Sequence, residues 1–355
     1  MRNSSSITDT ERRDTGLSDE GSGSPRELDR RVGTTGALGW LAQCGGTSAV
    51  IPIETIEALR AVIARADAAI PSDERKALTA RAIRLLPDVE AGVDLESPTR
   101  SLVSIGADIE SRFGAAGRAA FAAALVADLA LRRALLLTAS GLPESVLALY
   151  PATYRRLAGY LSTADLSAYW FGNDSFQKDL CIASGFSVPC GPVDVDLVAA
   201  ISRGSALKAM ALRGALSNGW AALRSGGPPW YRLHVDSRSL DDFNEAGWDR
   251  CYLRIAEMLI RDPRVKGVVG TTWFFDPQIV TISPRLAYLQ TRPLRHGAFL
   301  LPHGPSAMDT ENATSKSETR RRLYQEGRYL PMCYSMIWPR SPLIAWAQSE
   351  GGGDR

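Results

Sequence analysis

Residues 230–275 read WYRLHVDSRSLDDFNEAGWDRCYLRIAEMLIRDPRVKGVVGTTWFF, and this stretch decides the fold class. Trp230–Asp236 alternates apolar and polar residues, which predicts a strand, and Val265–Phe275 predicts a second strand. Between them, an apolar stripe at helical spacing predicts an amphipathic helix that ends at Asp262-Pro263: Leu240, Phe243, Trp248, Cys251, Ile255 and Leu259. Strand, helix and strand in this order predict a βαβ unit, whose right-handed crossover makes the two strands parallel.

Capping signals place further elements around this unit. Ser239, Ser283 and Ser315 stand where helix N-caps are expected: Ser239 and Ser315 each have an acidic residue three positions later, and Ser283 is followed by proline. We expect the last of these helices to end at Glu326 and Gly327 to be left-handed. A final strand is predicted over Leu330–Trp338.

The first half of the chain is different in character. Apolar residues repeat at helical spacing from about Ile53 to Leu149, and an Ala- and Leu-rich helix is predicted over Ala115–Leu137. Residues 1–36 are rich in Ser, Gly and charged residues, so we expect a disordered tail. The predicted fold is α+β or α/β, with a helical domain over 37–175, a mixed-sheet domain over 176–345 and a second disordered tail over 346–355.

Composition bounds the function. Apolar residues make up 45% of the chain and charged residues 23%, as expected of a soluble globular protein. A total of 41 Lys and Arg against 39 Asp and Glu gives no electrostatic reason to expect a nucleic-acid or acidic-membrane partner. Five cysteines without a C-x-x-C pair exclude a disulfide framework and indicate a reducing compartment. With no apolar signal or membrane-length segment, we expect a cytoplasmic protein.

The first candidate site is His234-Val-Asp236, where residues two apart on a strand share a face. One interpretation is that His234 or Asp236 is a general base. The alternative is a 2-His-1-carboxylate iron site, with His296 or His303 as the third ligand. The same residues also suit a strand histidine that is hydrogen-bonded to its neighbours, and on balance we expect no metal.

The second candidate site follows the second predicted strand. Trp273 and Asp276 stand where a strand gives way to a turn, a common place for binding groups. We predict that they contact a small-molecule substrate, together with Arg285. The other interpretation is that the aromatic residues are core and Asp276 only caps the turn. Cys181 and Cys190 have no neighbouring histidine, so we expect buried thiols rather than nucleophiles.

The segment Leu323-Tyr324-Gln325-Glu326-Gly327-Arg328-Tyr329 is similar to the "LYEKxGF" signature of the GCN5-related N-acetyltransferase (GNAT) superfamily. The order of elements from Trp230 to Trp338 also resembles that of the family's C-terminal half. This resemblance implies acyl transfer from acyl-CoA to an amine or hydroxyl of a small metabolite. It also implies that Tyr324 protonates the departing CoA thiolate.

The chain departs from the family at the acyl-CoA loop. Residues 237–242 read SRSLDD and lack the glycines whose backbone N–H groups hold the pyrophosphate at a helix N-terminus. This departure predicts that CoA binding is altered or lost. The remaining alternative is therefore a non-catalytic accessory or binding protein that keeps the fold.

Overall fold

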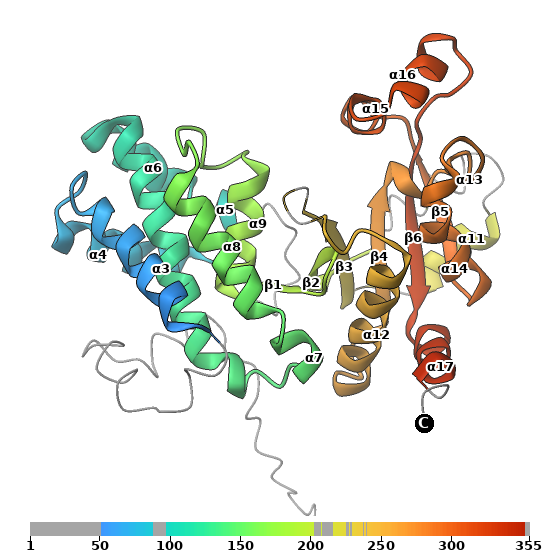
Figure 1. Ribbon diagram of the computed structural model, residues 1–355, viewed down its shortest axis with the longest axis horizontal. Helices are drawn as coiled ribbons and strands as arrows, with labels where there is room; N and C mark the ends of the chain where they lie inside the picture. Colours follow the sequence, from blue (N-terminus) through green and yellow to red (C-terminus); the bar gives the residue numbers. More distant parts are fainter. Residues whose placement is uncertain are drawn as a thin grey trace, which may run out of the picture.

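The computed structural model describes residues 51–87, 97–201, 207, 216–224, 227, 229–236, 238 and 240–351. Figure 1 shows a helical half, coloured blue to green, beside a sheet with its own helices, coloured yellow to red. This arrangement confirms the predicted α+β class, with a helical N-terminal part followed by a mixed-sheet part. The tail predicted over residues 1–36 lies outside the described residues.

The helical half follows the local signals of the sequence. Its elements are α3 (Ile53–Ala66), α4 (Ser72–Leu85), α5 (Ser97–Arg100), α6 (Val103–Leu136), η3 (Leu137–Ala139), α7 (Glu144–Leu147), α8 (Tyr150–Thr163) and α9 (Asp174–Ser184). Proline stands at the N-cap of α3, α4 and α7, where its missing N–H costs nothing. The predicted helix over Ala115–Leu137 forms most of α6, whose Ala-rich stretch is buried against α3 and α9.

Two glycines shape α6. Gly114 has φ 71° and interrupts the helical backbone, so α6 bends at this point. Gly106 lies against the indole of Trp170, where an added Cβ would stand 2.3 Å from Nε1. The missing side chain therefore lets Trp170 pack directly on the helix.

A six-stranded sheet forms the second half. Its strands are β1 (Ser187–Pro189), β2 (Val193–Ala199), β3 (Trp230–Val235), β4 (Gly267–Thr272), β5 (Phe299–Gly304) and β6 (Cys333–Pro339), in the order β1-β2-β3-β4-β6-β5. Neighbouring strands are antiparallel except β3 and β4, which are parallel and joined through α12 (Glu245–Arg261). The predicted βαβ unit is therefore confirmed.

Several boundaries differ from the prediction. β4 ends at Thr272, and Trp273–Phe275 forms the 3₁₀ turn η4, which the Thr272 hydroxyl caps. α12 begins at Glu245 because the Asn244 side chain accepts the N–H of Gly247 at 2.9 Å, so the start predicted from Ser239 is wrong. Ser239 itself lies outside the described residues.

The C-terminal helices also differ. They are α13 (Ile279–Ile282), η5 (Pro284–Leu286), α14 (Tyr288–Arg295), α15 (Ala307–Ser315), α16 (Glu318–Gln325) and α17 (Arg340–Gly351). Ser317, not Ser315, caps α16, because Ser315 is already the last residue of α15. Gly327 has φ 68° and confirms the predicted left-handed residue. α17 buries Trp346, so the disordered tail predicted from residue 346 is wrong as far as Gly351.

The two faces of the sheet are covered differently. Residues Val268, Met336 and Trp338 point to the face that α12 and α17 cover, and they belong to the main core. Their neighbours Val269 and Ile337 point to the other face, where they pack with Trp230, Leu301 and Ala222 of α11 (Leu216–Arg224). This alternation follows from the two-residue period of a strand, and it places the side chains of the candidate site on the α11 face.

No helix among the described residues combines the length and the apolar composition that crossing a membrane requires.

Candidate functional site

A row of polar side chains crosses the α11 face of the sheet. One residue comes from each of five neighbouring strands: Asp196 of β2, His234 of β3, Thr271 of β4, Ser335 of β6 and His303 of β5. Thr271 and Ser335 are direct cross-strand partners. We call these five residues the polar row.

His234 is hydrogen-bonded to Asp196 at one end of the row. The imidazole Nε2 lies 2.7 Å from Asp196 Oδ2, and the other carboxylate oxygen accepts the Ser187 hydroxyl at 2.6 Å. With a carboxylate as its partner, Nε2 carries the proton, which leaves Nδ1 as the basic nitrogen. The His234 side chain is 21% exposed, whereas the Asp196 side chain is 7% exposed. A buried carboxylate that orients a partly exposed imidazole is an arrangement suited to a general base.

Ser335 is the centre of a second hydrogen-bonded group in the row. Its Oγ lies 2.7 Å from His303 Nε2 and 2.7 Å from Thr271 Oγ1. Two assignments of protons satisfy both contacts: with Nε2 of His303 unprotonated, Thr271 donates to Ser335 and Ser335 donates to His303, and with Nε2 protonated both directions are reversed. A serine hydroxyl directed at an imidazole nitrogen is the contact that activates a nucleophile.

A cavity of about 370 Å³ connects these groups, which is large enough for a small molecule. Its lining combines polar groups with an apolar floor: Ala200, Ile201, Arg232, Leu233, His234, Val269, Thr271, Leu301, His303 and Ser335. Both histidines therefore face the same space.

The parallel pair separates beside this cavity. Ladder pairs join β3 and β4 only as far as Leu233 and Gly270, although the strands continue to Val235 and Thr272. The carbonyl of Val235 instead accepts the ammonium of Lys178 from α9 at 2.8 Å. The strand ends are thus free of each other next to His234.

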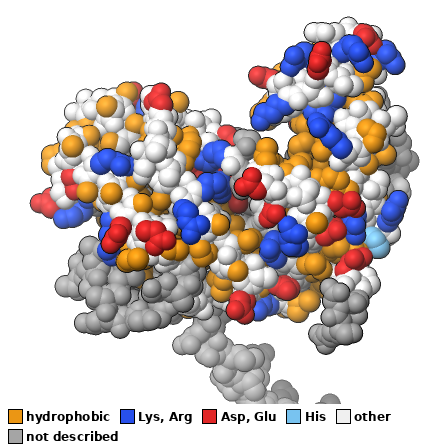
Figure 2. All heavy atoms as spheres, in the orientation of Figure 1, with side chains coloured by type: hydrophobic (Ala, Val, Ile, Leu, Met, Phe, Trp, Pro, Cys, Tyr) orange, Lys and Arg blue, Asp and Glu red, His pale blue; other side chains and the backbone are white. Residues whose placement is uncertain are grey.

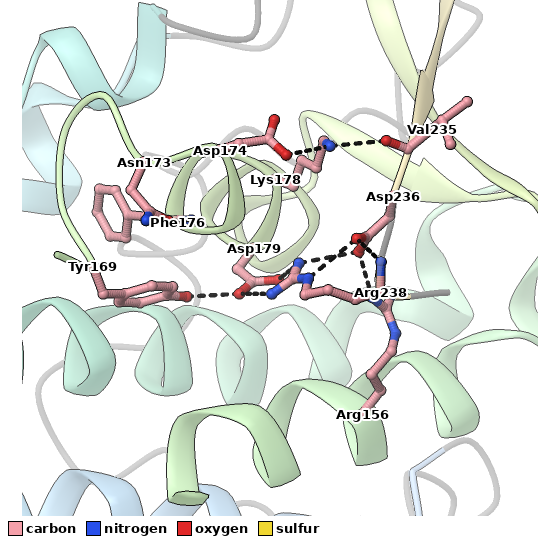
Figure 3. Close-up of polar contacts among 10 residues, drawn as sticks. All are labelled: Arg156, Tyr169, Asn173, Asp174, Phe176, Lys178, Asp179, Val235, Asp236 and Arg238. Carbon is pink, nitrogen blue, oxygen red and sulfur yellow. Dashed lines mark hydrogen bonds and ion pairs between the residues drawn. The ribbon is translucent and has the colours of Figure 1, made fainter. Parts of the chain in front are cut away.

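Asp236 lies in a charged cluster between the two halves of the molecule (Figure 3). Arg238 donates to its Oδ1 at 3.1 Å and its Oδ2 at 3.0 Å, and Arg156 of α8 also contacts Oδ2. Arg238 in turn binds both carboxylate oxygens of Asp179 at 2.7 and 2.9 Å, and Tyr169 donates to Asp179 at 2.8 Å. This cluster attaches the end of β3 to α8 and α9.

Electrostatics separate the roles of the carboxylates. Burial alone would raise the pKa of Asp236, but hydrogen bonds from Arg238 and the charge of Arg156 hold it well below its usual range. Asp236 is therefore a structural anion, with little basicity to offer. Burial raises the pKa of Asp194, the cross-strand partner of His234, to about 7. Asp194 thus adds little negative charge beside His234 below neutral pH.

The other predicted site residues lie elsewhere. Asp276 is 1% exposed, and its two oxygens accept the backbone N–H groups of Gln278 at 3.0 Å and Met332 at 3.1 Å. Trp273 is buried with the Arg320 guanidinium 4.6 Å above its ring. These contacts are structural, and neither residue lines the cavity.

Tyr324 and Arg285 are exposed. Tyr324 is 41% exposed on α16, in a lobe with α15 that projects from the sheet and carries many charged side chains (Figures 1 and 2). Arg285 is exposed in η5. The structure therefore does not bring either residue together with His234.

The iron hypothesis also finds no assembled site. His234 is bonded to Asp196, and the Asp236 carboxylate is occupied by two guanidinium groups. His303 shares the cavity with His234, whereas His296 is exposed and its ring lies near Trp346, away from the cavity. Within the described part of the chain, no group of three or more His, Cys, Asp or Glu side chains is arranged to hold a metal ion.

The described cysteines agree with the prediction of buried thiols: Cys181, Cys190, Cys251 and Cys333 are buried, and none of the four forms a disulfide. A hydrogen bond with Cys251 and burial raise the pKa of the Cys190 thiol well above its usual range. A thiol in this state is a poor nucleophile.

Sequence reasoning missed Asp196, Thr271 and Ser335. Only the first left a signal, because Val193-Asp-Val-Asp196 places two carboxylates on one face of an otherwise apolar strand. Thr271 and Ser335 are ordinary strand residues until the register brings them together.

No protein-family model matches the chain. No curated protein matches its sequence. Among solved structures, the chain is similar to an acyltransferase crystallised in complex with decanoyl-CoA and teicoplanin. The identity is 16% and the TM-score 0.41, over 75% of this chain and 88% of that chain.

Proposed function

We propose that the protein transfers an acyl group from an acyl-CoA thioester to an amine or hydroxyl of a small molecule. The observation that carries the proposal is the His234–Asp196 pair, whose histidine lines a cavity beside the ends of β3 and β4. A base, a space for an acceptor and an open strand edge for an extended donor occur at one place. Acyl transfer requires mainly that two substrates are held in line, and this arrangement can do so.

His234 is the general base in this proposal. Nδ1 accepts the proton of the acceptor's N–H or O–H as the acceptor attacks the thioester carbonyl, and the C–S bond then breaks. Asp196 keeps the imidazole oriented and stabilises the imidazolium that forms, at 2.7 Å. Asp236, the other residue predicted for this role, instead positions the end of β3 through Arg156 and Arg238.

The β3–α12–β4 unit with an antiparallel β6 beside it supports the proposed resemblance to the GNAT family. The L-Y-x-x-G segment does not support this resemblance, because Tyr324 lies exposed on the projecting α16. We therefore propose acyl transfer without Tyr324 as the general acid.

The start of α12 favours one alternative. Asp242 and Glu245 flank the Asn244 cap, so the helix N-terminus already has acidic neighbours where a pyrophosphate would lie. This observation favours an accessory protein that binds a small molecule in the cavity without using CoA. If CoA is the donor, its diphosphate is held by contacts other than this helix end.

Thermal-shift measurements and a transfer assay separate these functions. We expect acetyl-CoA or a longer acyl-CoA to raise the melting temperature, and Fe(II) with 2-oxoglutarate to leave it unchanged. Acyl-CoA and a panel of amines and alcohols should release free CoA. Removal of the base in His234→Asn should lower this rate about 10²–10⁴-fold.

Ser184→Ala is the matched control, because it removes a buried hydroxyl that donates only within α9 and not in the cavity. No melting shift with any acyl-CoA, together with no CoA release, would exclude acyl transfer and leave the accessory alternative. If His234→Asn leaves the rate of CoA release unchanged, His234 is not the general base.

A further inference from the structure

We infer that Ser335 is a nucleophile that carries the acyl group between donor and acceptor, with His303 as its base. This inference rests on the proposed acyl transfer and replaces the acceptor's direct attack on the thioester with two steps through an ester on Ser335. Its basis is that Ser335 Oγ lies 2.7 Å from His303 Nε2 and that both residues line the same cavity. That distance lies within the range at which a base activates a serine.

The surroundings of Ser335 favour attack on an acyl group from the cavity. The residue is only 5% exposed, and it lines the cavity. When Nε2 of His303 is unprotonated and accepts the Ser335 hydroxyl, the Thr271 hydroxyl, 2.7 Å away, donates to a lone pair of Ser335 Oγ. In that state both hydrogen-bond partners hold Ser335 Oγ at the wall of the cavity.

The first step consumes the thioester. Ser335 Oγ attacks the carbonyl carbon and passes its proton to His303 Nε2, a C–O bond forms, and the C–S bond breaks. The imidazolium of His303 returns that proton to the departing thiolate. The products are a free thiol and an ester on Ser335, so atoms and charge balance.

The second step uses the other histidine. The acceptor gives its proton to His234 Nδ1 and attacks the ester carbonyl, and the C–Oγ bond breaks. Water in the cavity protonates the departing Ser335 Oγ and takes the proton from His234 Nδ1, so both side chains are restored. β3 and β6 are separated by one strand, so their axes lie about 10 Å apart, which leaves room for an ester carbonyl and an attacking atom between Ser335 and His234.

The arrangement explains why the row holds two separate histidine pairs. His234 with Asp196 forms a base at one side, and His303 with Ser335 forms a nucleophile at the other. A direct transfer needs only the first pair. A two-step transfer uses both.

Rapid-quench mass spectrometry tests the inference with two donors and no acceptor. Acetyl-CoA and p-nitrophenyl acetate should each give a burst of about one equivalent of leaving group and an acetyl group mapped to Ser335. The burst should disappear in Ser335→Ala, persist in Ser184→Ala, and slow about 10²–10⁴-fold in His303→Asn. His234→Asn should keep the burst and accumulate the adduct, because only the second step is blocked.

Ser335→Cys guards against a folding defect in the alanine variant. It retains a nucleophile and should be acetylated as a thioester, whereas a purely structural hydroxyl would give no adduct in either protein. Turnover of acetyl-CoA at the wild-type rate in Ser335→Ala, or without any adduct in the wild type, overturns the inference and leaves the proposed function intact. A burst and adduct with the nitrophenyl ester but none with acetyl-CoA keeps the nucleophile and refutes CoA as donor. No adduct with either donor refutes the nucleophile.

Discussion

Arg238 and Arg264 provide a matched test of how burial determines the strength of an ion pair. Each lies two residues after an aspartate and makes the same local contacts. Arg238 donates from N, Nε and Nη2 to Asp236 at 2.9, 3.1 and 3.0 Å, and Arg264 donates to Asp262 at 3.1, 3.0 and 3.0 Å. The Arg238 and Asp236 side chains are 19% and 5% exposed, whereas those of Arg264 and Asp262 are 70% and 30% exposed.

We expect Arg238→Gln to lower the free energy of unfolding by about 3–5 kcal/mol, because it leaves a buried charge without its partner. The substitution also removes both hydrogen bonds that Arg238 makes to Asp179, whose side chain is 7% exposed. Arg156 still contacts Asp236, which favours the lower end of this range. Arg264→Gln should cost about 0–1 kcal/mol, as exposed pairs do.

Urea unfolding at pH 7, followed by tryptophan fluorescence, measures both variants against the wild type. The pKa of Asp236 is lower in the folded than in the unfolded protein, so its stabilisation is present above the unfolded pKa and is lost as pH falls. The loss of unfolding free energy that Arg238→Gln causes, relative to the wild type, should therefore become smaller at acidic pH. Equal losses of unfolding free energy in the two variants, or a loss below about 1 kcal/mol for Arg238→Gln, would refute the idea that burial makes the Arg238–Asp236 ion pair the stronger one.

Three further predictions concern other parts of the molecule. The pKa of Asp194 is raised to about 7, so the folded state holds a proton that the unfolded state has released, and stability falls as pH rises from about 4 to 7. Asp194→Asn should flatten that slope and stabilise the protein by up to about 4 kcal/mol at pH 8, measured by urea unfolding at several pH values; an unchanged slope contradicts the shift. Gly106→Ala places a Cβ 2.3 Å from Trp170 and should cost about 1–3 kcal/mol through overpacking, whereas Gly159→Ala meets nothing within 4 Å and should not. Tyr324→Phe should leave the acyl-transfer rate within a factor of two of the wild type, since the phenol is exposed on α16; a large loss restores the Tyr324 hypothesis.

Sequence patterns were sufficient to predict those helices and strands whose structure depends on residues close together in the chain. The strand over Trp230–Val235, the amphipathic helix after it and its parallel return strand follow from spacing alone. Helix starts were less predictable, since several residues that stand close together are possible N-caps and the structure uses Asn244 and Ser317. Such competition depends on where the preceding loop runs, which spacing does not encode.

The sequence by itself determined a helical half, a βαβ unit and buried cysteines, because periodicity and composition act between residues close in the chain. Only the tertiary structure decided the site. It moved Asp236 into a cluster with Arg156 and Asp179, and it joined Asp196 to His234 and Ser335 to His303. The physical reason is that strand register, set by packing of the whole sheet, determines which polar side chains from distant segments come within hydrogen-bond distance.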